Sequence, residues 1–262
     1  MPALILSTYT VMGLNHEYTT MNTIPNIHAM IVAAGRGSRF GASIAKQYTM
    51  LEGQTLLQHS VARLAYSDYI DKCLLVISAD DSTAQQLEFA LPVRYAVGGA
   101  ERWQSVQSGV EAISQTGADD SDLVLIHDAA RPAVPNVDID QVIEAAMLEP
   151  YGAILATPVA DTLKASYQQA TSAEESRPHS YTKTTIDRSN MWQAQTPQVF
   201  RLGQLKKVLN HVFEHQLSIT DEASAFEQLD LPIRLVSGSR QNIKLTYPDD
   251  AVLLTAIMAL QS

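Results

Sequence analysis

The sequence has a single cysteine, no long apolar run and no cation near its start. Cys73 alone cannot form an internal disulfide or a multi-cysteine zinc site, which suits a reducing cytosol. No apolar stretch reaches the roughly 20 residues of a membrane-spanning helix. The first 35 residues contain neither Lys nor Arg, whereas secretory and transit peptides carry basic residues there. We therefore expect a cytoplasmic protein without a membrane span, and a loosely ordered extension over residues 1–26.

Positive charge is also scarce along the whole chain. Acidic residues outnumber basic ones by 28 to 18, which gives a net charge of −10 and would repel a nucleic-acid backbone. We expect no nucleic-acid partner. Hydrophobic residues make up 46% of the sequence, so an ordinary globular fold is expected. If the substrate is anionic, the few cations must gather near it, and their positions are therefore informative.

Short apolar runs alternate with longer helical patterns, which is typical of a mostly parallel, Rossmann-like α/β sheet with helices on both faces. Strands are predicted at residues 28–34, 73–78, 93–97, 123–127, 152–156 and 233–236. Helices are predicted at residues 56–66, 82–90, 103–115, 137–148, 202–215 and 221–229, and from about 248. We expect one domain over residues 27–262. Residues 160–190 are polar and cannot bury much, which indicates an inserted arm or a disordered insertion.

A glycine-rich segment, Gly35-Arg36-Gly37-Ser38-Arg39, directly follows the first predicted strand. Glycines let backbone N–H groups approach phosphate oxygens without an intervening Cβ. The first three cations of the chain, Arg36, Arg39 and Lys46, lie on this loop or just after it. A turn that merely requires glycine would not need such a cluster, so an anion site is favoured.

Spacing separates this loop from other phosphate loops. A Walker A loop requires Gly-Lys-Ser/Thr at its end, but Gly41 is followed by Ala42-Ser43, which excludes it. A dinucleotide fingerprint requires a third glycine where the chain has Phe40, which weakens that alternative without removing it. A second predicted strand ends at His127-Asp128. Ligands bind beyond the carboxyl ends of strands in open α/β sheets, so both segments should meet at one crevice.

Several motifs follow one another in a characteristic order. They are Ala33-Ala34-Gly35-x-Gly37-x-Arg39, Lys46-Gln47-Tyr48, Gly98-Gly99-Ala100-Glu101-Arg102, His127-Asp128-Ala129-Ala130-Arg131-Pro132, Pro158-Val159-x-Asp161-Thr162, Asp187-Arg188, Gln195-Thr196-Pro197-Gln198, Thr220-Asp221-Glu222-Ala223 and Asn242-Ile243-Lys244. From about residue 28 to the end, the sequence resembles the 2-C-methyl-D-erythritol 4-phosphate cytidylyltransferase family.

This resemblance implies a fold of the nucleotide-diphospho-sugar transferase type with an extended dimerisation arm. It also implies an enzyme that joins CTP and methylerythritol phosphate to give CDP-methylerythritol and pyrophosphate, in non-mevalonate isoprenoid synthesis. A homodimer through the arm is expected, with Mg²⁺ held mainly by the CTP phosphates and no protein metal site. Three alternatives stay open: a ribitol 5-phosphate cytidylyltransferase, an inactive nucleotide-binding module and a nicotinamide-dependent reductase.

The resemblance also implies roles for individual residues. The expected catalytic cations are Arg39 and Lys46. The expected substrate-positioning residues are Arg188, Lys244, Asp128, Arg131, Thr162, Thr196 and Thr220. The expected nucleotide-binding residues are Ala33, Ala34, Gly35, Gly37, Gly99, Ala100, Ser105, Asp128 and Ala129. Many relatives carry Asp at position 100, so only backbone contact is expected from Ala100, and Arg188 could act on the partner subunit. His127 is expected to be a packed strand-end residue.

Overall fold

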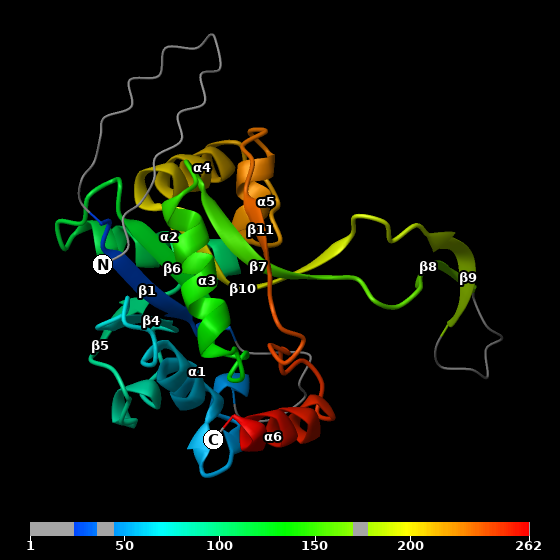
Figure 1. The fold of residues 1–262 in the computed structure, drawn as a ribbon, viewed down its shortest axis with the longest axis horizontal. Helices are drawn as coiled ribbons and strands as arrows, with labels where there is room; N and C mark the ends of the chain where they lie inside the picture. The colour runs from blue at the N-terminus through cyan, green and yellow to red at the C-terminus, as the bar shows by residue number, and fades with distance from the viewer. Residues whose placement is uncertain (1–23, 36–44, 170–177, 262) are drawn as a thin grey trace, which may run out of the picture.

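The computed structural model describes residues 24–35, 45–169 and 178–261. A seven-stranded sheet runs through its centre in the order β11-β7-β10-β6-β1-β4-β5 (Figure 1). These strands are β1 (Ile27–Val32), β4 (Cys73–Ile77), β5 (Val93–Val97), β6 (Leu123–Asp128), β7 (Gly152–Pro158), β10 (Trp192–Arg201) and β11 (Arg234–Ser237). Only β10 is antiparallel to its neighbours, β6 and β7. The predicted mostly parallel α/β sheet is confirmed.

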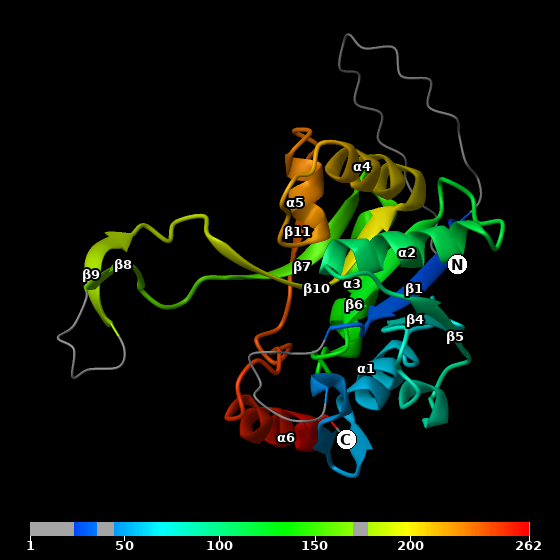
Figure 2. The same cartoon turned by 180° about the vertical axis from the view of Figure 1, so that it is seen from behind.

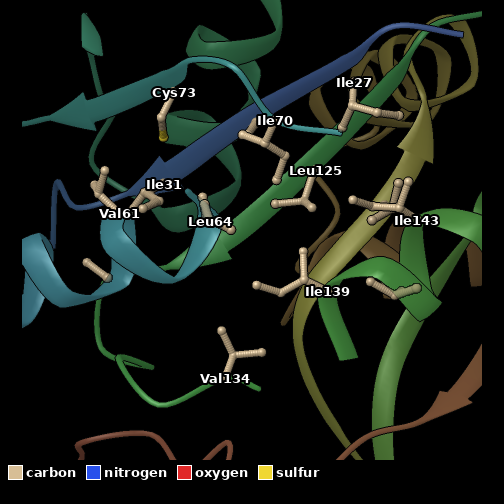
Figure 3. Close-up of a cluster of buried hydrophobic side chains, with 14 of the residues drawn as sticks. Ile27, Ile31, Val61, Leu64, Ile70, Cys73, Leu125, Val134, Ile139 and Ile143 are labelled. Carbon is tan, nitrogen blue, oxygen red and sulfur yellow. The ribbon is translucent and has the colours of Figure 1, made fainter. Parts of the chain in front are cut away.

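Helices cover both faces of this sheet (Figures 1 and 2). The helices are α1 (Leu56–Leu64), α2 (Arg102–Ser114), α3 (Asn136–Met147), α4 (Leu202–Glu214), α5 (Glu222–Glu227) and α6 (Asp250–Leu260). Alternate residues of β1 serve the two faces: Ile31 packs with α1 and α3, whereas Met30 packs with α2, α4 and α5. Figure 3 shows the hydrophobic cluster around Ile31, in which Val61 and Leu64 of α1 point towards Ile31. The sheet is therefore a rigid platform between two apolar layers.

One central strand was not predicted. β10 lies between β6 and β7, yet its sequence is rich in Gln and contains Pro197, which argues against a central strand. A register shift between Ala194 and Gln198 accommodates the proline, so residues on either side of it still pair with β7. The small hairpin formed by β2 (Met50–Leu51) and β3 (Gln54–Thr55) was also missed.

The helix predicted at residues 82–90 is wrong. Only a short 3-10 helix, η3 (Ala84–Gln86), forms there. The chain then becomes extended at Leu87, and Leu87, Phe89 and Leu91 alternate with exposed residues. Phe89 and Leu91 pack on the core. Apolar residues at every second position favour an extended chain, and this pattern outweighed the helical propensity of the neighbouring residues.

The polar segment forms an arm that reaches away from the body of the molecule (Figures 1 and 2). Two antiparallel strands, β8 (Leu163–Gln169) and β9 (His179–Ile186), pair only with each other. Nearly all of their side chains are exposed, including the stacked rings of Tyr167 and Tyr181, whose centroids are 5.8 Å apart. No helix in the described ranges is both long and apolar enough to cross a membrane.

Candidate active site

A cavity of about 220 Å³ lies beyond the carboxyl ends of β1, β5 and β6. The chain leaves β1 towards β4 and β5 and later returns to the other side of β1 as β6, so the strand order reverses between β1 and β6. Ligands bind at such reversals in α/β sheets. The last residues of the two strands, Val32 and Asp128, are register partners, and both line the cavity. The two segments expected to meet at one crevice do so.

The turn after β1 contributes Ala33, Ala34 and Gly35 to this cavity. Among the described residues, no atom would lie within 4 Å of a Cβ built on Gly35, and its φ is not left-handed, so neither packing against these residues nor backbone conformation requires glycine there. A glycine at this position lets a ligand approach the backbone closely. Lys46 lines the cavity at the start of the 3-10 helix η2 (Lys46–Tyr48). Gly37 and Arg39 lie outside the described residues.

The turn after β5 forms the opposite wall. A Cβ on Gly98 would lie 2.5 Å from the Cβ of Ala34, so this glycine allows the two walls to approach. The Gly99 N–H donates to Oγ of Ser105 over 3.2 Å, and Ser105 itself is only 2% exposed. Ser105 therefore holds the turn, while Gly99 and Ala100 present backbone to the cavity.

A chain of alternating charges forms the floor. Asp128 accepts hydrogen bonds from Lys244 Nζ over 2.6 Å and from Arg102 Nη2 over 3.2 Å. The Nη1 atom of Arg102 also donates to both carboxylate oxygens of Glu222, which is completely buried. Burial favours the protonated form of Asp128, but Arg102 and Lys244 outweigh burial and hold its pKa below the usual range. The Asp128 carboxylate is thus ionised and fixed in place.

Hydrogen bonds among Thr196, His127 and Arg131 hold the end of β6 in place. The Asp128 N–H donates to Thr196 Oγ1 over 3.0 Å, and Thr196 Oγ1 is also 3.0 Å from His127 Nδ1. The His127 Nε2 atom lies 3.0 Å from the carbonyl oxygen of Arg131, which can only accept, so Nε2 carries the proton and Nδ1 accepts from Thr196. Burial lowers the pKa of His127 to about 4. His127 is packed as predicted, and Thr196 supports the backbone of Asp128.

A second cavity, of about 610 Å³, adjoins the first and shares Lys244 with it. Arg131 lines this second cavity, and its guanidinium donates to the carbonyl oxygen of Asn242 over 2.6 Å. Asp161 and Leu163, at the base of the arm, contribute to the same lining. A hydrogen bond to the backbone therefore directs Arg131 towards a space next to the first cavity.

Besides Arg131 and Thr196, three predicted site residues in the described ranges are absent from the lining of the first cavity. Arg188 is exposed between β9 and β10, and Thr162 is exposed just before β8. Leu163 pairs with Ile186, so Thr162 and Arg188 flank the same end of the hairpin. Thr220 is exposed before α5, where its N–H donates to Ser224 Oγ. None of the three lines the first cavity.

Sequence reasoning gave no role to several residues of the site, among them Arg102, Glu222 and Gln47. Arg102 and Glu222 connect the floor of the cavity to α5, and Gln47 lines the cavity beside Lys46. Each of them lies inside one of the sequence motifs. Only the motifs could have indicated a role for them, because a single charged or amide residue is otherwise expected on the solvated surface.

A cavity at the reversal point of a doubly wound sheet, with a glycine turn and lysines around it, is the arrangement of a nucleotidyltransferase. The family model for 2-C-methyl-D-erythritol 4-phosphate cytidylyltransferase matches residues 27–260. The chain belongs to this family, and the resemblance found in its motifs is confirmed.

Individual relatives agree with this assignment. The 2-C-methyl-D-erythritol 4-phosphate cytidylyltransferase of Psychrobacter arcticus is 71% identical, over 95% of this chain and 97% of the relative. A crystal structure of a 4-diphosphocytidyl-2C-methyl-D-erythritol synthase is 35% identical, covers 90% of this chain and 100% of its own, and superposes with a TM-score of 0.74. The Francisella tularensis enzyme is 30% identical with a TM-score of 0.72, over 88% of this chain and 99% of its own.

Proposed function

We propose that the first cavity is where this chain carries out the reaction of its family. A phosphate oxygen of methylerythritol phosphate forms a bond to the α-phosphorus of CTP, and the bond from that phosphorus to the bridging oxygen breaks as pyrophosphate leaves. The observation that carries this proposal is that Lys46 and Lys244 lie around one glycine turn, in a chain with a net charge of −10. Such cations offset the repulsion between two anionic substrates.

The cytidine half of CTP fits the walls of this cavity. Gly99, Ala100 and the turn that Ser105 holds would read the cytosine through backbone groups. Asp128 would accept a hydrogen bond from a ribose hydroxyl, because its carboxylate is ionised and aimed at the cavity. Beside it, the backbone of Ala129 would contact the ribose. The backbone N–H groups after β1 would face the phosphates.

The phosphates would lie against the cations. A phosphate monoester is largely ionised near neutral pH, because its second pKa is about 6, so no protein base is required. Lys46, together with Arg39, would stabilise the charge that develops on the leaving pyrophosphate, and Lys244 would hold the attacking phosphate. The chemistry that this chain supplies is thus positioning and positive charge.

Magnesium would enter with the triphosphate. Phosphate oxygens are the hard ligands that Mg²⁺ prefers, and when bound it would neutralise part of the triphosphate charge. In the parts of the chain that the structure describes, no group of three or more His, Cys, Asp or Glu side chains could hold a metal ion.

The arm accounts for the residues that lie apart. Thr162 and Arg188 stand together at the base of a hairpin that reaches away from the body, and Arg131 faces the neighbouring second cavity. We infer that two copies associate through their arms and that Arg188 of one copy, with Thr162 beside it, helps to hold methylerythritol phosphate next to Arg131 in the site of the other. Cys73, buried in β4 as a free thiol, suits a reducing cytoplasm as the compartment.

One experiment tests the assignment of the cavity. Purified protein with Mg²⁺, CTP and methylerythritol 4-phosphate is expected to release pyrophosphate, and Lys46→Ala is expected to lose at least about a hundredfold in kcat while its melting temperature stays unchanged. Ribitol 5-phosphate is the comparison substrate. Preferred turnover of ribitol 5-phosphate, or full activity of Lys46→Ala, would contradict the proposal.

A second experiment tests the arm. Lys46→Ala and Arg188→Ala protomers are unfolded together and refolded, so that mixed dimers form. If Arg188 serves the other copy, a mixed dimer contains one intact site, and about a quarter of the wild-type sites are recovered from two inactive parents. Recovery of no activity from mixtures that contain dimers would place Arg188 in its own copy's site.

A further inference from the structure

Among the described residues, the short helix that carries Lys46 makes few hydrogen bonds of its own. η2 has three residues, and no side-chain hydrogen bond caps its start. Its own backbone provides two bonds, from Tyr48 N to the carbonyl oxygen of Ala45 and from Thr49 N to that of Lys46. A lysine side chain is long and has many rotamers, so a loosely held backbone would spread its ammonium group over a wide volume. The position of Lys46 must depend on other contacts.

The first of these contacts comes from the chain after β1. The side chain of Gln47 is 6% exposed, and its Nε2 atom donates to the carbonyl oxygen of Ala33 over 2.7 Å. Ala33 belongs to the turn that lines the cavity. The bond therefore connects the residue next to Lys46 directly to the proposed phosphate cradle.

The second contact comes from the loop after β4. The hydroxyl of Tyr48 donates to Oδ2 of Asp81 in a very short hydrogen bond. The other oxygen of Asp81 accepts from the backbone N–H groups of Thr83 and Ala84, each over 3.1 Å. Burial, together with Asp81, raises the pKa of Tyr48 above its usual value, so its hydroxyl stays a donor. Asp81 is thereby fixed by η3 and in turn fixes Tyr48.

We propose that Gln47 and Tyr48 are positioning residues that hold Lys46 at the cavity from both sides. Gln47 ties η2 to the end of β1, and Tyr48 ties it through Asp81 to the end of β4, which is the neighbouring strand. Since β1 and β4 are part of the same rigid sheet, these bonds hold the ammonium group of Lys46 at a fixed position relative to the glycine turn. This inference rests on the proposed role of Lys46 in the reaction.

The chain offers a matched control for Tyr48. The hydroxyl of Tyr95 on β5 donates to the carbonyl oxygen of Ala84, so it contacts the same 3-10 helix η3 without touching η2. Tyr48→Phe and Tyr95→Phe each remove one hydroxyl and one hydrogen bond at η3. A role in the stability of that loop would make the two variants alike, whereas a role in placing Lys46 affects Tyr48→Phe alone.

The test compares kcat, the two KM values and the melting temperature of these variants. Tyr48→Phe and Gln47→Met are expected to lower kcat by about tenfold each, with KM values changed less than about threefold, because a misplaced group costs rate more than ground-state binding. Tyr95→Phe is expected to keep wild-type kcat. Equal kcat for Tyr48→Phe and Tyr95→Phe would overturn the proposal.

A double-variant comparison shows whether the effect passes through Lys46. In the Lys46→Ala background, Tyr48→Phe and Gln47→Met are expected to cause no further loss of kcat, because the group that they position is gone. An undiminished tenfold loss in that background would refute the positioning role. Full activity of Lys46→Ala by itself would instead contradict the proposed function, so the two failures are distinguishable.

Discussion

The buried pair between Arg102 and Glu222 allows a quantitative prediction. Glu222→Gln keeps the shape of the side chain but removes the charge that faces Arg102. The Glu222 side chain is 0% exposed and that of Arg102 is 28% exposed. Removing one partner of a buried pair costs about 3–5 kcal/mol. Water reaches part of the guanidinium and Asp128 still faces it, so we expect a loss of about 2–3 kcal/mol in the free energy of unfolding.

The control is the same substitution in an exposed pair. Glu149 and Arg234 form an ion pair in which their side chains are 33% and 48% exposed, and Glu149→Gln is expected to cost less than about 1 kcal/mol. Urea denaturation gives both free energies, and a fall in melting temperature of about 5–10 °C should accompany Glu222→Gln. A loss below about 1 kcal/mol for Glu222→Gln would show that the pair contributes no more than a surface pair.

Two further predictions concern the walls and the floor of the cavity. Gly35→Ala is expected to keep the wild-type melting temperature but to raise the KM for CTP, since its Cβ would meet no atom of the described residues. Gly98→Ala should lower the melting temperature, because its Cβ would lie 2.5 Å from that of Ala34. His127 has a folded pKa of about 4 against an ordinary 6.5, so the unfolded chain takes up the proton first. Stability should therefore fall between pH 6.5 and 4, by up to about 3 kcal/mol, and urea titrations of His127→Gln should show a flatter pH dependence.

The fold could be read from the sequence wherever one kind of periodicity dominated. The buried strands β1, β4 and β6 are nearly continuous apolar runs, and α1, α2 and α3 carry one apolar face, so their positions were predicted within about two residues. β10 could not be read in the same way. It forms its ladder across a proline and polar side chains, and its place in the sheet depends on pairing with strands far away in the chain. Such long-range pairing has no local signal.

Part of the site could be predicted from the sequence for a different reason. Strand order places the ends of β1 and β6 side by side, so the glycine turn and Asp128 could be expected to meet. Arg102 and Glu222 could not be paired by sequence, because they are 120 positions apart and each resembles an ordinary surface charge. Their pairing depends on how α2 and α5 pack on the same face of the sheet. Side-chain partners of this kind emerge only from the packed structure.

One copy of the chain is not enough to assign the residues of the arm to a site. Motif order assigned Thr162 and Arg188 to the same substrate as Lys244, yet the hairpin register places Thr162 and Arg188 together at the base of the arm, exposed and away from the first cavity. Lys244 is shared by both cavities, and Arg131 faces only the second. A cytidine-binding half and a polyol-binding half that meet at Lys244 would account for this division. Within the described residues, the first half is lined by one copy alone, and the second would receive the exposed Arg188 if two copies associate through their arms.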